Sequence, residues 1–166
     1  MSRPSFSAAW AVSRRIYAAS DPNARVAEVI GGAVAVNINS PAPYGWTNTC
    51  AVRMSYILNQ TGVVIPPAGG KTVTGSDKKN YFYRVSEVIG FLTHRWGEPD
   101  LMLPYPPSGG GVFVGKKGLI LFEVSGWRTA RGHATLWDGG QCYDHCYFNE
   151  PGSSYRTDRA NFWSLP

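Results

Sequence analysis

The spacing of apolar residues changes once along this chain, and the change indicates a mixed fold. Residues 81–96 carry the strongest amphipathic helical pattern, whereas residues 118–126 and 132–140 have the pattern of strands. A Gly139-Gly140 turn follows the second strand, and a third strand is predicted from Gln141. Helices that precede an antiparallel sheet are typical of the α+β class.

The helix predicted over residues 81–96 places its apolar side chains on one stripe and leaves His94 outside it, where we expect a solvated side chain. The stripe consists of Val85, Val88, Ile89, Leu92 and Trp96. The other expected segments are a helix within residues 6–20, a second from Asp21-Pro22 to Gly31-Gly32, a third over 49–59, and turn-rich loops at 65–77 and 104–111.

Composition bounds the size of the fold and the kind of partner. The 166 residues are 43% hydrophobic and 13% aromatic, which suits one well-filled core, so we expect a single domain over residues 1–166. The formal net charge of +5 suits an anionic polymer such as the cell wall, but the basic residues are scattered and accompany no nucleic-acid motif. For that reason we expect no nucleic-acid partner. We also expect no membrane partner, because no stretch is long enough to span a bilayer. No secretory signal is recognised, so a role outside the cytoplasm would require a separate export machine.

Cys50 stands where a helix is about to begin. Asn48 and Thr49 before it favour a helix N-cap, and apolar residues after it fall at helical spacing. A helix N-terminus stabilises a thiolate over a thiol, which makes Cys50 a candidate nucleophile. An ordinary buried cysteine is the alternative, and this segment by itself favours neither.

A nucleophilic cysteine needs a base, and His133 is the best-placed histidine. It begins the predicted strand GHATLW and shares a face with Thr135 and Trp137, whereas His94 lies on a helix surface and His145 lies between two cysteines. In papain-like enzymes the cysteine likewise opens a helix and the histidine comes from a later strand. The alternative is a purely structural histidine.

Two aspartates could orient His133. In a hairpin that turns at Gly139-Gly140, Thr135 faces Asp144, so Asp144 lies on the face of His133. Asp138 falls on the opposite face and suits a turn. We therefore favour Asp144.

Cys142 and Cys146 leave the local structure around Asp144 open. Four residues of extended strand span about 13 Å, whereas a disulfide needs Cα atoms within about 7 Å, so a strand and a bridge exclude each other here. A zinc site is a third possibility, with Cys142, His145 and Cys146 as ligands and His133 or Cys50 as the fourth.

Several segments resemble the type VI secretion amidase effectors of family 4, which are papain-like cysteine peptidases of the NlpC type. The most specific are WTNTCAVRMSYILN around Cys50, GHATLW, and the aspartate between two cysteines in CYDHC. RPSFSAAW, EVIGGAVAVNI and NYFYRVSEVIGFLTHRWGEPD are also similar to that family, so the resemblance spans nearly the whole chain. It implies a papain-like fold with helices packed on an antiparallel sheet.

The resemblance also implies an activity and its residues. It predicts a cofactor-free amidase that hydrolyses the γ-D-glutamyl–meso-diaminopimelate bond of peptidoglycan stem peptides, with Cys50 as nucleophile, His133 as base and Asp144 orienting His133. Cys142 and Cys146 are then expected to form a disulfide. Synthesis in the cytoplasm, delivery by the type VI secretion apparatus, action in the periplasm of a rival bacterium and a cognate immunity protein follow from the same resemblance.

For the reaction itself we expect the backbone N–H of Cys50 and one further donor to meet the oxyanion, with Asn48 as the candidate donor. The rival interpretation is a non-catalytic cell-wall-binding module, which the 6 Trp, 9 Tyr and 7 Phe residues suggest. A binding module would adhere to the wall without releasing fragments from it.

Overall fold

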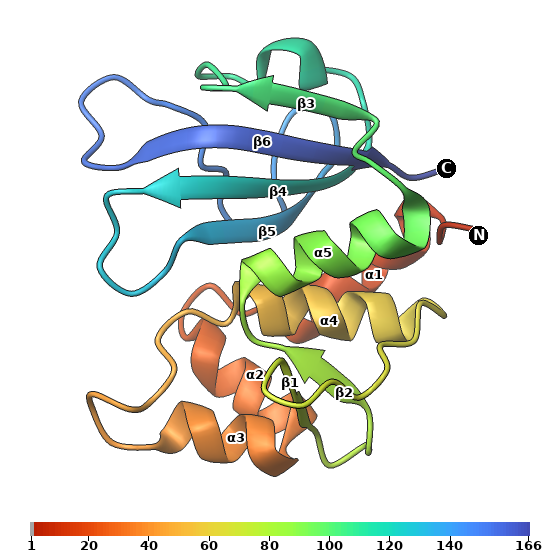
Figure 1. Ribbon diagram of the computed structural model, residues 1–166, viewed down its shortest axis with the longest axis vertical. Helices are drawn as coiled ribbons and strands as arrows, with labels where there is room; N and C mark the ends of the chain where they lie inside the picture. The colour runs from red at the N-terminus through yellow and green to blue at the C-terminus, as the bar shows by residue number, and fades with distance from the viewer. Residues whose placement is uncertain (1) are drawn as a thin grey trace.

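The computed structural model describes residues 2–166 and has a helical part packed below a sheet (Figure 1). The helices are α1 (Phe6–Ile16), α2 (Pro22–Ile30), α3 (Gly32–Asn39), α4 (Cys50–Gln60), α5 (Val85–Trp96) and the short 3-10 helix η1 (Gly111–Phe113). The strands are β1 (Thr72–Thr74), β2 (Asn80–Phe82), β3 (Leu101–Pro104), β4 (Gly118–Ser125), β5 (Gly132–Trp137) and β6 (Arg156–Ser164). The α+β class predicted from the sequence is confirmed.

The N-terminal helices begin at side chains that cap them. Ser5 and Asp21 each accept a hydrogen bond from the backbone N–H three residues later, which starts α1 and α2. The second helix ends at Gly31 as predicted, but α3 follows it at once and was not expected. Within residues 2–166 no helix is both long and apolar enough to cross a membrane.

The predicted loop at residues 65–77 is only partly a loop. Thr72–Thr74 form β1, which pairs antiparallel with β2. The composition of this segment, with Gly69-Gly70 and Gly75 around a short strand, concealed the hairpin.

The helix predicted over residues 81–96 begins four residues late, at Val85, because Tyr81 and Phe82 belong to β2. The backbone N–H of Phe82 donates to Ser55 Oγ of α4 at 3.0 Å, which fixes the hairpin on that helix. From Val85 onward the prediction is correct, and His94 is exposed as expected.

The main sheet is antiparallel with the strand order β3-β6-β4-β5, so β5 lies at an edge. β4 and β5 confirm the strands predicted at 118–126 and 132–140. The third strand predicted from Gln141 is wrong: Cys142 pairs with Trp137 in a single bridge, and the chain then curls away. The neighbour of β4 on its other side is β6, from the end of the chain, which was not predicted.

Apolar side chains fill both faces of the sheet. On the helix side, alternate residues of β4 and β5 pack with the helices, and on the other side their neighbours pack with Phe113 and Phe148. His133 is paired with Phe122 across the β4–β5 ladder and follows Gly132, whose carbonyl oxygen lies 3.8 Å from the Cys50 sulfur at the start of α4. Edge strand β5 therefore carries His133 beside the start of α4.

Gly132 allows β4 and α5 to approach β5 closely beside His133. A Cβ added at this position would lie 2.4 Å from the carbonyl oxygen of Phe122 in β4 and 3.1 Å from Val85 Cγ1 in α5. The glycine that precedes His133 is thus a packing requirement.

Replacing Gly132 with Ala should lower the free energy of unfolding by about 1–3 kcal/mol, because β4 or α5 must move to admit the methyl group. Urea unfolding followed by tryptophan fluorescence measures the loss. Gly140→Ala is the matched control, since the nearest atom to a Cβ there lies 3.9 Å away. Equal stability of the two variants would contradict this account of the packing.

Candidate active site

Cys50 is the first residue of α4, and a neighbouring side chain caps the helix. The Cys50 N–H donates to Asn48 Oδ1 at 3.0 Å, whereas Thr49 occupies the N-cap position without a side-chain cap bond. The Cys50 thiol is free and 2% exposed, and it lies 3.8 Å from the carbonyl oxygen of Gly132. The sulfur is therefore at the N-terminus of the helix, where the sequence placed it.

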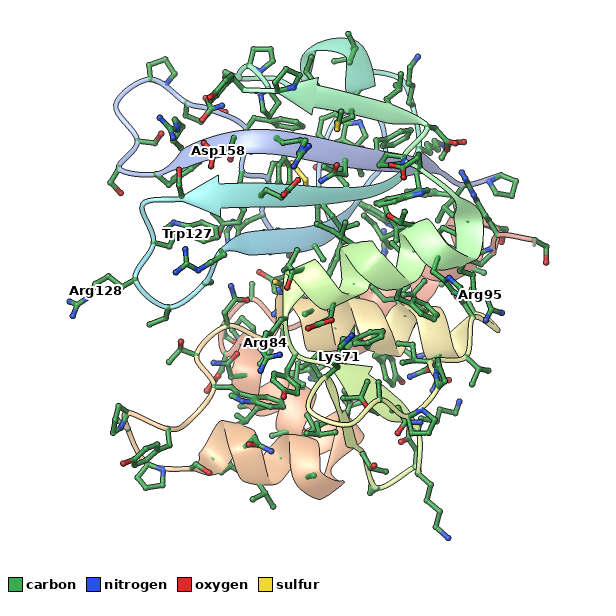
Figure 2. All side chains as sticks on the ribbon, viewed as in Figure 1. Lys71, Arg84, Arg95, Trp127, Arg128 and Asp158 are labelled. Atoms are coloured by element: carbon green, nitrogen blue, oxygen red, sulfur yellow. A yellow bond between two sulfur atoms is a disulfide. The ribbon has the colours of Figure 1, made fainter. Side chains whose placement is uncertain are left out.

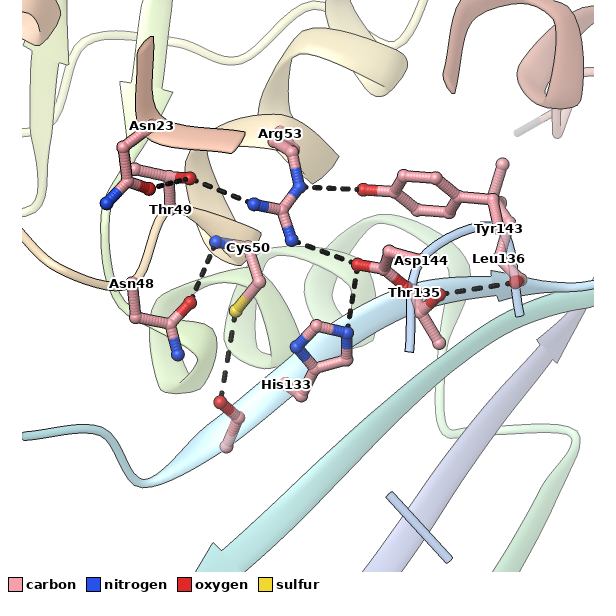
Figure 3. A network of polar contacts seen from close by, with 11 residues as sticks. Asn23, Asn48, Thr49, Cys50, Arg53, His133, Thr135, Leu136, Tyr143 and Asp144 are labelled. Atoms are coloured by element: carbon pink, nitrogen blue, oxygen red, sulfur yellow. Dashed lines mark hydrogen bonds and ion pairs between the residues drawn. The ribbon is translucent and has the colours of Figure 1, made fainter. Parts of the chain in front are cut away.

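His133 lies between Cys50 and Asp144 (Figure 3). Its Nδ1 points toward the Cys50 sulfur, and its Nε2 lies 3.0 Å from Asp144 Oδ2. The rings of Phe122 and Tyr147 flank the imidazole at centroid distances of 6.5 and 4.7 Å. The structure thus brings together the three side chains that the sequence singled out.

The Asp144 side chain is completely buried and bonded on both oxygens. Thr135 Oγ1 donates to Oδ1 at 2.6 Å, and Arg53 Nη2 donates to Oδ2 at 2.9 Å. Asp138 instead accepts the backbone N–H groups of Gly140 and Gln141 and closes the turn after β5. Asp138 therefore forms the turn that we expected, and Asp144 lies beside His133 as expected, although not on the hairpin strand from which that position was predicted.

A disulfide between Cys142 and Cys146 encloses Asp144 in a short loop, hereafter the stapled loop (residues 142–146). The two Cα atoms are 5.5 Å apart, so the chain curls between them. This settles the choice between strand and bridge in favour of the bridge. Both sulfurs are bonded to each other, so they cannot serve as thiolate ligands in the zinc site that the spacing had left open.

Arg53 belongs to the same network and was not predicted. It is 5% exposed, and besides Asp144 it contacts Thr49 Oγ1 and the Tyr143 hydroxyl, at 2.9 and 3.1 Å. Its position three residues after Cys50 places it on the same face of α4, which is the one sequence clue to its role.

The charges in the network shift one another's pKa values. Burial alone would raise the pKa of Asp144, but His133 and Arg53 hold it well below its usual range. Burial would lower the pKa of His133, but Asp144 and Cys50 raise it to about 9. Burial would raise the pKa of Cys50, yet His133 and Arg53 lower it below its ordinary value. The imidazole and the thiol therefore each favour the charged form of the other, as a thiolate–imidazolium pair requires.

A cleft of about 360 Å³ opens beside this network. Asn48 and His133 line it on the side of the candidate nucleophile, and Trp127, His145 and Tyr147 contribute aromatic rings. The β4–β5 loop forms one lip: Trp127 lies near the sheet, and Arg128 extends away from it into solvent (Figure 2). A polypeptide or similar chain with a scissile carbonyl could reach the site through this opening.

Comparison with known proteins identifies the family. The family model described as type VI secretion system (T6SS), amidase effector protein 4, or Tae4, matches residues 46–163 and so includes every side chain of the network from Thr49 onward. The chain belongs to the Tae4 family. No curated protein sequence matches it.

Solved Tae4 structures extend the similarity over the whole chain. Tae4 from Salmonella typhimurium, in complex with the immunity protein Tai4 from Enterobacter cloacae, is 41% identical with a TM-score of 0.86, covering 99% of this chain and 100% of that one. Tae4 from Enterobacter cloacae is 39% identical with a TM-score of 0.85, and each chain is covered completely. As a Tae4 protein, the chain is a peptidoglycan amidase and an effector of type VI secretion, and the papain-like α+β fold expected from the sequence is confirmed.

Cys50 should react with iodoacetamide at a lower pH than an ordinary thiol requires, because His133 and Arg53 lower its pKa. His133→Ala removes a cation that favours the thiolate and should move the midpoint of the rate to higher pH. Intact-mass measurements between about pH 4 and 9 would follow the reaction, since an unperturbed thiol titrates near 8.5.

His145→Ala serves as the control, because His145 lines the cleft but is exposed. It should leave the midpoint unchanged. Coincident midpoints for the wild-type chain and His133→Ala would contradict the proximity of imidazole and thiol.

Proposed function

We propose that this Tae4 protein cleaves the amide bond between γ-D-glutamate and meso-diaminopimelate in peptidoglycan stem peptides through a Cys-His-Asp mechanism. Cys50 is the nucleophile, His133 the general base and acid, and Asp144 the residue that orients His133. The observation that carries the proposal is the placement of His133, with Nδ1 toward the Cys50 sulfur and Nε2 3.0 Å from Asp144 Oδ2.

In this mechanism the Cys50 thiolate attacks the carbonyl carbon of the scissile amide, and the C=O π electrons move to oxygen. The tetrahedral intermediate collapses as His133 Nδ1–H protonates the leaving amine of diaminopimelate. A water molecule then attacks the thioester while neutral His133 accepts its proton. Release of the γ-carboxyl product regenerates the thiolate and the imidazolium.

The oxyanion requires donors, and the cap of α4 supplies candidates. In the free protein the backbone N–H of Cys50 donates a hydrogen bond to Asn48 Oδ1, and Asn48 lines the cleft. We propose that the substrate carbonyl oxygen replaces Oδ1 as the acceptor of this N–H and that the Asn48 amide nitrogen is the second donor.

The setting of the reaction follows from the family and the disulfide. Solved Tae4 proteins are found in complexes with the immunity protein Tai4, and we propose a cognate immunity protein for this chain as well. The Cys142–Cys146 bridge suits an oxidising compartment, which supports action in the periplasm of a target bacterium. We take the whole chain to be a single amidase domain, because the elements that carry Cys50 and His133 pack together.

Purified peptidoglycan fragments incubated with the wild-type chain should be cut between D-glutamate and diaminopimelate, whereas Cys50→Ala should leave them intact because no thiolate remains. Mass spectrometry of the fragments identifies the bond, and circular dichroism checks that the variant is folded. Activity retained in the folded Cys50→Ala variant would contradict the proposed mechanism. Fragments that bind the wild-type chain and stay uncut would instead favour a wall-binding module.

Asn48→Ala should lower kcat by about 100- to 1000-fold, the usual cost of losing an oxyanion donor. The rate of Cys50 alkylation at neutral pH should change far less, since His133 and Arg53 remain. Steady-state assays on a soluble stem peptide, together with the alkylation rate, separate the two effects. A kcat within about twofold of wild type would remove Asn48 from the mechanism.

A further inference from the structure

Arg53 is a buried charge that the proposed mechanism does not yet use. It lies on α4 three residues after Cys50, and 5% of its surface is exposed. Burying an arginine is costly unless its donors are satisfied and its charge is paired, so its contacts need an explanation.

One side of the Arg53 guanidinium faces the candidate triad. Its Nη2 donates to Asp144 Oδ2 at 2.9 Å, and this is the same oxygen that lies 3.0 Å from His133 Nε2. Thr135 holds the other oxygen of Asp144 at 2.6 Å. With Arg53 and Thr135 in place, the carboxylate has a single orientation in which Oδ2 faces the imidazole.

The other donors of Arg53 fix the guanidinium itself. Nη1 donates to Thr49 Oγ1 at 2.9 Å, and the Thr49 hydroxyl donates in turn to Asn23 Oδ1 of α2 at 2.9 Å. Nε donates to the Tyr143 hydroxyl in the stapled loop at 3.1 Å, and the guanidinium carbon lies 5.2 Å from the ring centre of Tyr17. Arg53 is thus held by α4, by the N-terminal helices and by the stapled loop (Figure 3).

We propose that Arg53 is a positioning residue that fixes Asp144, and through it the His133 ring, relative to Cys50. This inference rests on the proposed function of Cys50, His133 and Asp144. Its physical basis is that one helix carries both the nucleophile and, one turn later, the anchor of the carboxylate. The geometry at both ends of the triad is then set by α4.

The network also alternates in charge, from Arg53 through Asp144 and His133 to Cys50. Arg53 favours the charged form of Asp144 directly and also lowers the pKa of Cys50. Loss of Arg53 should therefore move the acid limb of activity to higher pH. The titratable groups that face this site are Tyr17 from the end of α1, Cys50 and Arg53 from α4, His133 from β5, and Tyr143, Asp144, His145 and Tyr147 from the segment after β5.

The test compares kcat, KM and the pH profile of stem-peptide hydrolysis in Arg53→Met and Arg53→Lys with the wild-type chain. Arg53→Met should lower kcat about 100-fold, as expected for a displaced catalytic group, and shift the acid limb upward. Arg53→Lys keeps the charge but cannot make the three directed contacts, so kcat should fall by about tenfold or more while the acid limb stays near wild type. KM should change little in both.

Arg3→Met is the matched control. Arg3 also pairs with a carboxylate, the exposed Asp100, and lies 5.3 Å from the ring centre of Trp96, but it joins the N-terminus to β6 and the end of α5. Its loss should leave kcat and the acid limb unchanged. Thermal unfolding of all variants shows how much of any effect is a loss of folded protein.

Three results would overturn the inference. If folded Arg53→Met or Arg53→Lys kept wild-type kcat, or changed KM alone, Arg53 would have no positioning role, and if both variants failed to fold its role would be structural only. A failure of the proposed function is distinguishable, because the wild-type chain would then show no cleavage, or cleavage that persists in Cys50→Ala.

Discussion

The arrangement of the site depends on the contacts of one buried group, the Asp144 carboxylate. It is completely inaccessible, and an ionised group in that position is stable only because Arg53, Thr135 and His133 surround it. These partners come from α4 and β5, and Asp144 itself comes from the stapled loop. The carboxylate therefore joins the helical part of the chain to the edge of the sheet at the point where chemistry takes place.

The fold prepares this meeting point from both sides. α4 supplies a helix N-terminus for the thiol, and the edge position of β5 lets His133 reach it without an intervening strand. Gly132 permits the close packing of β5 against β4 and α5, and this packing fixes the position of the neighbouring His133 relative to Cys50. The disulfide closes residues 142–146 into a short loop after β5. The backbone therefore does not continue as a strand, and the Asp144 side chain faces the imidazole.

Much of the site could be predicted because its signals are local. A cap before Cys50, alternation around His133 and the two cysteines around Asp144 are each visible within a few residues. The disulfide itself required the family resemblance, since the hairpin argument gave the right aspartate from a strand that does not exist. Arg53 could not be predicted because its partners, Tyr17, Thr49, Tyr143 and Asp144, are brought together only by the tertiary fold.

The parts of the fold that escaped prediction depend on pairing between distant segments. β6 was missed because Arg156, Asp158 and Arg159 interrupt its apolar alternation, and a register shift after Glu123 accommodates the irregular half. Its buried half, around Phe162 and Trp163, is stabilised by β4 and β3 on either side. β3 is a short edge strand that pairs only with β6, so the local sequence pattern could not predict it.

The most direct test of the account is the protonation state of His133 in the free protein. Nitrogen-15 NMR of histidine-labelled chain, with the His133 signal assigned from a His133→Gln spectrum, should show an imidazolium through neutral pH that loses its proton near pH 9, because Asp144 and Cys50 raise its pKa to about 9. A midpoint near the ordinary histidine value of about 6.5 would contradict the charged network at the centre of the site.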